Sequence, residues 1–126
     1  MKEFKKYYII PETPDQVYLA LVTETTISLW TGEEAKMKEE INTEFELFGG
    51  NIVGKNLAFE KGKQLTQQWY FGNDAEPSIV TIKLHPHKNN QTSLELKHTN
   101  IPDADYNEIV EGWNDVYMES LIEFYS

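Results

Sequence analysis

The chain of 126 residues contains no cysteine and no arginine, and both absences limit what it can do. Without cysteine it can form neither disulfides nor thiolate metal sites, and a cysteine nucleophile is excluded. Without arginine it lacks the side chain that most often clamps carboxylates and phosphates through two hydrogen bonds. The basic residues are 11 lysines against 21 acidic residues, which gives a net charge of −10. Because nucleic-acid binding needs a basic surface, no nucleic-acid partner is expected.

Long hydrophobic runs are also missing. No N-terminal apolar segment is typical of a signal peptide, and no run approaches the length of a membrane span. The sequence therefore predicts a cytoplasmic protein without a membrane span. Apolar residues make up 40% of the chain and aromatic residues 13%, which is typical of a globular protein. At this length, residues 1–126 are predicted to form a single domain.

The segment 103–126 carries the strongest periodic pattern. Apolar residues recur at steps of three and four, which predicts a long amphipathic helix. Its apolar face is formed by Tyr106, Ile109, Val110, Trp113, Val116, Tyr117, Leu121 and Phe124. The segment has no basic residue, and its acidic residues gather mainly on the opposite face, which favours solubility or, alternatively, docking of a basic partner. Gly112 inside this helix costs about 1 kcal/mol relative to Ala, which indicates close packing or a local helix bulge beside Trp113.

The rest of the chain is predicted to form strands and two short helices. Phe4 to Ile10 is a first strand, and Thr13 with Pro14 starts a short helix in which Gln16 would complete a capping box. Thr23 would cap a second short helix that ends at Gly32. From residue 35 onward the apolar pattern changes to a period of two, which predicts strands. These cover residues 35–47, 52–60, 64–71, 80–84 and 92–99, with loops over 73–77 and 85–90.

This order of elements predicts an α+β fold in which a bent antiparallel sheet of six to seven strands wraps around the C-terminal helix. Clean alternation means that one face of the sheet is covered and the other is wet. A glycine within the third predicted strand, Gly54, marks a bulge or a close backbone approach. A strongly bent sheet that holds a helix leaves space between them, where a ligand could bind.

Short motifs in a fixed order along nearly the whole chain support this fold. They are Pro14 with Val17-Tyr18, Trp30-Thr31-Gly32, Phe45 to Gly50, Ile52-Val53-Gly54, Gln68-Trp69, Val80-Thr81-Ile82, His98 to Pro102 and Gly112-Trp113. In these motifs the chain resembles the helix-grip fold of the START and birch-pollen-allergen-like (SRPBCC) superfamily. Within it, the chain is similar to the family named after the C-terminal domain of the activator of heat-shock protein 90 ATPase.

Two departures from that family bear on function. Asn42 and Thr43 stand where members often have a pair of glycines. The resemblance covers only the C-terminal domain of the two-domain eukaryotic activators, so it does not imply full co-chaperone activity. It implies a START-like module with a cavity between helix and sheet.

Polar residues on the apolar strand faces are the candidates for contact with a ligand. They are Glu39, Gln67 and His98, and an aromatic wall would be formed by Trp30, Phe45, Trp69, Phe71, Trp113 and Tyr117. A mostly apolar pocket with a few convergent polar groups is the usual form of a small-molecule site. The alternative is that the aromatic residues are plain core and that His98 is a structural histidine. The pair His85 and His87 lacks a nearby third ligand, so no metal and no cofactor are expected.

Two functions from different classes follow. The first is a module that binds an apolar or aromatic small molecule. The second is a protein-interaction or chaperone-associated module of the stress response, docking through the acidic helix face or the outer face of the sheet. A weaker alternative is a cyclase- or hydrolase-like enzyme that uses Glu39 and His98, which are weak catalytic candidates. This hypothesis requires both side chains to lie within hydrogen-bonding reach of one bound ligand. The sequence carries little that is typical of an enzyme.

Overall fold

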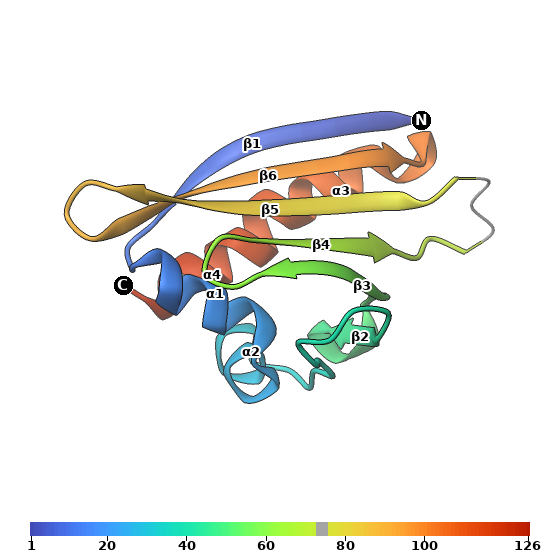
Figure 1. Ribbon diagram of the computed structural model, residues 1–126. Coiled ribbons are helices and arrows are strands. Elements are labelled where there is room, and N and C mark those ends of the chain that lie inside the picture. The colour runs from blue at the N-terminus through green and yellow to red at the C-terminus, as the bar shows by residue number, and fades with distance from the viewer. Residues whose placement is uncertain (73–75) are drawn as a thin grey trace.

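One antiparallel sheet of six strands forms the centre of the molecule. The structure is a computed structural model that describes residues 1–72 and 76–126 (Figure 1). The strands lie in the order β1-β6-β5-β4-β3-β2. Their bounds are β1 (Lys2–Ile10), β2 (Glu44–Leu47), β3 (Ile52–Glu60), β4 (Gln64–Trp69), β5 (Ser78–His87) and β6 (Gln91–Ile101). The loop predicted over 73–77 lies mostly outside the described residues.

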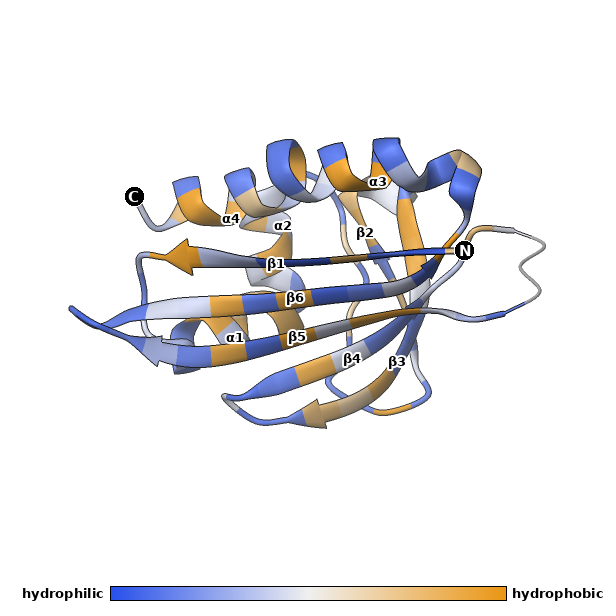
Figure 2. Ribbon diagram, turned by 90° about the horizontal axis from the view of Figure 1, so that it is seen from above, coloured by the Kyte–Doolittle hydropathy of each residue, from blue (hydrophilic) through white to orange (hydrophobic). Residues whose placement is uncertain are grey.

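Helices cover one face of this sheet. The C-terminal helix runs along it, and the opposite face is left to solvent (Figure 2). Helix α1 (Pro14–Val22) packs against β5 and β6, and α2 (Glu24–Thr31) packs against the end of the C-terminal helix. The predicted α+β helix-grip fold is therefore confirmed. Pro14 starts α1 and Gly32 ends α2 in a left-handed conformation, as predicted, but the Thr13 and Thr23 side chains make no capping hydrogen bond in the described structure.

The prediction of a strand over residues 35–47 is wrong for most of this segment. Regular pairing begins only at Glu44, and residue 36 contributes a single isolated bridge. Between them the chain forms a loop in which Ile41 is 61% exposed. The amide of Asn56, buried in β3, donates to the Lys38 carbonyl and to Thr43 Oγ1, each at 3.2 Å. Side-chain hydrogen bonds thus hold the segment between residue 36 and Glu44 in a loop, although apolar and polar residues alternate in it as in a strand.

The C-terminal helix contains a π-helical turn. It consists of η2 (Asp103–Asp105), α3 (Tyr106–Gly112), the π-helical η3 (Trp113–Tyr117) and α4 (Met118–Phe124). A π-helical turn inserts one extra residue into the helix. C-terminal to this turn, the residues that face the sheet are therefore shifted by one position in the sequence. Val116 and Phe124, predicted on the apolar face, are 49% and 40% exposed, whereas Met118 is fully buried. The predicted bulge is therefore confirmed.

Gly54 and Gly112 have different roles. A Cβ atom at Gly54 would lie 2.0 Å from the Gln68 carbonyl oxygen and 2.8 Å from the Phe45 ring, so the predicted close approach is confirmed. The register of β3 against β4 shifts further along, between Asn56 and Ala58. A Cβ atom at Gly112 would meet nothing within 4 Å. Close packing therefore does not explain this glycine, which faces open space.

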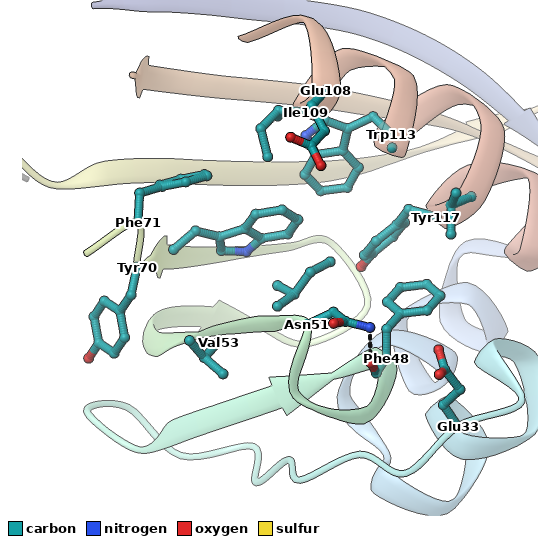
Figure 3. Close-up of a pocket in the computed structure, with 14 residues that line it drawn as sticks. Glu33, Phe48, Asn51, Val53, Tyr70, Phe71, Glu108, Ile109, Trp113 and Tyr117 are labelled. Carbon is teal, nitrogen blue, oxygen red and sulfur yellow. Dashed lines mark hydrogen bonds between the residues drawn. The ribbon is translucent and has the colours of Figure 1, made fainter. Parts of the chain in front are cut away.

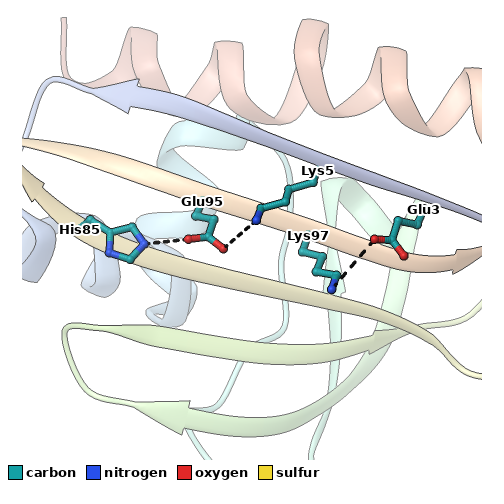
Figure 4. A network of polar contacts seen from close by, with 5 residues as sticks. All are labelled: Glu3, Lys5, His85, Glu95 and Lys97. Carbon is teal, nitrogen blue, oxygen red and sulfur yellow. Dashed lines mark hydrogen bonds and ion pairs between the residues drawn. The ribbon is translucent and has the colours of Figure 1, made fainter.

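The outer face of the sheet is polar and carries a network of ion pairs (Figure 4). Glu95 accepts from His85 Nε2 at 2.9 Å and lies 3.8 Å from Lys5 Nζ. These contacts, that of His85 first, lower the pKa of the Glu95 carboxyl. Lys97 and Glu3 form a second pair at 4.0 Å. His85 is thus engaged by a carboxylate on the wet face, away from the covered face of the sheet.

Candidate ligand pocket

A pocket of about 350 Å³ opens between the first half of the C-terminal helix and the ends of β3 and β4 (Figure 3). The residues that line it are Glu33, Phe48, Asn51, Ile52, Val53, Trp69, Tyr70, Phe71, Glu108, Ile109, Gly112, Trp113, Val116 and Tyr117. They come from the loop after α2, the turn after β2, strand β3, the end of β4, α3 and η3. Segments far apart in the sequence therefore meet at this site.

Four aromatic side chains form the floor of the pocket. The Trp69 and Trp113 rings stack with their centroids 4.7 Å apart and their planes at 21°. Tyr117 packs against Trp113 at 4.5 Å, and Phe48 lies 6.1 Å from Tyr117. Both indoles are almost fully buried, at 5% and 1% exposure. The aromatic residues are therefore packed as core, and the remaining space lies in front of them.

His98 fixes the orientation of Trp113 through a buried chain of hydrogen bonds. Trp113 Nε1–H donates to His98 Nδ1 at 3.0 Å, and His98 Nε2 lies 2.8 Å from Ser78 Oγ. Ser78 Oγ in turn donates to the Thr99 carbonyl at 3.1 Å. This sequence of donors assigns the Nε2–H tautomer of a neutral imidazole, since Nδ1 must accept. Burial lowers the pKa of His98 to about 4, so the ring is uncharged at neutral pH.

Gln67 fixes Trp69 in the same way. Trp69 Nε1–H donates to Gln67 Oε1 at 3.1 Å, and Gln67 Nε2 donates to Asn56 Oδ1 at 3.3 Å. Gln67 and Asn56 are both buried. Each indole of the floor is therefore held by its N–H group. Sequence reasoning singled out Gln67 and His98 as groups that orient a ligand, but the structure shows both engaged with the indoles behind the pocket surface.

Glu39 lies apart from the other predicted site residues. It belongs to the exposed loop that replaces the predicted strand, and its Oε2 accepts from the Tyr18 hydroxyl at 2.6 Å. Both ring nitrogens of His98 are already occupied. The structure therefore does not bring Glu39 and His98 together on one enclosed ligand, which the acid–base pair requires. Among the described residues, no three His, Asp or Glu side chains are grouped to hold a metal ion.

The predicted aromatic wall divides into two layers. Trp69, Phe71, Trp113 and Tyr117 line the pocket. Trp30 lies behind it, edge-on to Tyr117 at 5.2 Å, with its Nε1–H donating to the Ala20 carbonyl. Phe45 also lies outside the lining and packs over Gly54.

Sequence reasoning missed several residues of the pocket. Ile109 and Val116 could have been assigned to it from the apolar pattern of the helix. Phe48 could not, because its position depends on a turn in which it adopts a left-handed backbone with φ of 53°. Glu33 and Glu108 carry no pattern that separates them from the many other acidic residues.

Comparison with known protein families agrees with this architecture. The family model described as "Activator of Hsp90 ATPase homolog 1-like protein" matches residues 12–124. The Hsp90 co-chaperone AHA1 of Saccharomyces cerevisiae is 26% identical over 113 residues, which are 84% of this chain and 32% of the relative. The activator of 90 kDa heat shock protein ATPase homolog of Dictyostelium discoideum is 27% identical over 103 residues, which are 80% of this chain and 27% of the relative. The chain thus spans about a third or less of these curated relatives.

Solved structures share the fold. An HSP90 activator from Plasmodium falciparum superposes with a TM-score of 0.85 at 23% identity, over 94% of this chain and 92% of that one. CalU16 from Micromonospora echinospora superposes with a TM-score of 0.81 at 25% identity, over 98% of this chain and 76% of that one. The family model matches more than half of the chain, and these structures share its helix-grip architecture. The chain therefore belongs to the Activator of Hsp90 ATPase homolog 1-like family.

Proposed function

We propose that this protein binds a small apolar or aromatic molecule in the pocket beneath α3. The observation that carries the proposal is the pocket itself, an opening of about 350 Å³ in front of two stacked indoles. Ligand pockets are commonly about 300–1,000 Å³ and are lined mainly by apolar and aromatic side chains. None of the helices within residues 1–72 and 76–126 has the length and hydrophobicity of a membrane span.

Preorganisation supports the same proposal. The two indole N–H groups are held by Gln67 and His98, so the floor has one fixed arrangement before a ligand arrives. A rigid site loses less conformational entropy on binding, which favours affinity. Trp69, Trp113 and Tyr117 supply apolar surface, and Ile109 and Phe71 bound the opening. Gln67 and His98 act on the ligand only through the indoles.

Filling the pocket from Gly112 tests this proposal. Gly112 lines the pocket and a Cβ atom there would meet nothing within 4 Å, so we expect the side chain of Gly112→Leu to enter the pocket. We expect saturable fluorescence enhancement of the neutral probe N-phenyl-1-naphthylamine with the wild type, and an affinity at least about tenfold lower with Gly112→Leu. Asn107→Leu, on the exposed side of α3, is the matched control and retains the wild-type affinity. Absence of saturable binding, or equal binding by Gly112→Leu with an unchanged melting temperature, would refute the proposal.

A second candidate is a chaperone-associated, protein-interacting role. The curated relatives are an Hsp90 co-chaperone and an activator of the heat shock protein ATPase, although this chain spans a minor part of each. The exposed residues Glu111, Asp115 and Glu119 lie on α3, η3 and α4, in a segment without basic residues, and offer a surface for a basic partner.

Binding of an Hsp90-type chaperone distinguishes this candidate from the first. We expect affinity that falls as the Debye length shortens below about 8 Å, and that is lost in Glu111→Lys/Asp115→Lys/Glu119→Lys. Probe binding in the pocket should survive both changes. If the affinity for the chaperone changes neither with salt nor in this triple variant, the acidic helix face is not the docking surface.

A further inference from the structure

We infer that the ligand of this pocket is a cation, namely an aromatic amine whose ring enters the pocket and whose ammonium group stays at the mouth. This inference rests on the proposed function and narrows it to one class of ligand. It is drawn from the charges around the opening and from the chemistry of the floor. The proposed ligand is a free small molecule.

Two carboxylates line the pocket from different elements. Glu108 is on α3 beside Ile109, and Glu33 is in the loop after α2, near Phe48 (Figure 3). Both residues are exposed. Among the described residues, no ion pair joins either carboxylate to a lysine, and none of the lining residues is a lysine. The opening therefore carries two negative charges and no positive one.

The surroundings strengthen this negative field. The helix that bounds the pocket belongs to the segment 103–126, which holds Asp105, Glu111 and Asp115 as well as Glu108 and contains no lysine. Charges of one sign around a low-dielectric cleft concentrate ligands of the opposite sign. An anionic ligand of the same shape would meet repulsion from both carboxylates.

The floor of the pocket also favours a cation. The negative faces of indole and phenol rings attract ammonium groups, with an energy of about 0.5–2 kcal/mol. Trp69, Trp113 and Tyr117 line the pocket, and because they are only 5%, 1% and 4% exposed, their attraction adds a smaller share to that of the carboxylates. An aromatic amine can therefore place its ring against the floor and its charge between the floor and the carboxylates, and a neutral analogue uses only the first of these contacts.

Three naphthalene derivatives of similar shape test the inference by isothermal titration calorimetry. They are 2-(1-naphthyl)ethylamine, 2-(1-naphthyl)ethanol and 1-naphthylacetate, which are a cation, a neutral molecule and an anion at neutral pH. At low salt we expect the amine to bind about tenfold more tightly than the alcohol, and the acetate to bind most weakly. The advantage of the amine should shrink as salt is added, while the affinity of the alcohol stays constant.

Two double variants test the role of the carboxylates at the pocket opening, and the second is the matched control for the first. Glu33→Gln/Glu108→Gln should remove most of the advantage of the amine over the alcohol without changing the affinity of the alcohol. Glu111→Gln/Glu119→Gln removes the same charge from helix residues outside the pocket lining, and most of the preference should persist. Equal binding of the three probes by the wild type, or an undiminished preference in Glu33→Gln/Glu108→Gln, would overturn the inference while leaving the pocket intact. Failure of all three probes together with N-phenyl-1-naphthylamine would instead overturn the proposed function.

Discussion

The two ends of the C-terminal helix meet the sheet in different ways. In α4, Met118 and Leu121 are fully buried, and α2 packs against this end. In α3 no residue is fully buried, and Ile109 and Val110 remain partly accessible. The π-helical turn lies between the two ends. One helix thus closes the core at its C-terminal end and borders a pocket at its N-terminal end. Different turns of this helix therefore stabilise the fold and line the pocket.

Truncating one apolar side chain at each end should separate the two roles. Leu121→Ala leaves a cavity in a closed core and should lower the free energy of unfolding by about 3 kcal/mol. Ile109→Ala removes a partly exposed side chain beside existing space, so the loss should be about 1 kcal/mol or less. Urea denaturation of both variants measures the difference. Equal losses would mean that the two ends contribute equally to the core.

His98 acts where the two ends join, because it holds Trp113, the first residue of the π-helical turn. The unfolded chain takes up a proton on this histidine near pH 6.5, whereas the folded protein resists protonation down to about pH 4. The stability that depends on neutral His98 is therefore complete above about pH 6.5 and is lost as the pH falls towards 4.

Comparison with His98→Gln isolates this effect from the titration of the carboxylates. Glutamine can accept from Trp113 and donate to Ser78, but it does not titrate. The wild type should lose about 2 kcal/mol more than the variant between about pH 7 and pH 4.5, as measured by urea denaturation at each pH. Parallel losses in the two proteins would show that His98 is not the group that titrates.

The smallest effect is expected at Gly112, where the open end begins. Its backbone is helical and a Cβ atom meets open space, so Gly112→Ala should raise the free energy of unfolding by up to about 1 kcal/mol. Thermal or urea denaturation measures the gain. A loss of stability would instead show that the helix needs glycine for close packing at this point.

Most of the fold could be predicted from periodicity. The alternation in β3 to β6 and the three- and four-residue steps of the C-terminal helix depend on local pattern, and both are confirmed. Two of the errors arise where the local pattern is overridden by other contacts. Residues 36–43 alternate like a strand but are held in a loop by the Asn56 amide and other side-chain hydrogen bonds, and the π-helical turn moves the buried face by one residue.

The site was less predictable, because it depends on contacts between distant segments. Trp69 and Trp113 could be placed on inward faces, but their hydrogen bonds to Gln67 and His98 depend on the register of the strands. In that register Gln67 is opposite Val80, and Val80 is opposite His98. The carboxylates of the mouth come from a loop and from the partly exposed side of a helix, where composition gives no signal.

Strand β1 forms one edge of the sheet, and its lysines have a consequence for the behaviour of the protein at high concentration. An edge strand offers unpaired backbone groups to any other strand that can align with it. Lys2, Lys5 and Lys6 all lie in this strand. A second copy aligned along the same edge would bring ammonium groups of the two chains close together. The lysines of β1 therefore oppose edge-to-edge growth into fibrils at this edge of the sheet, whereas β2 forms the other edge.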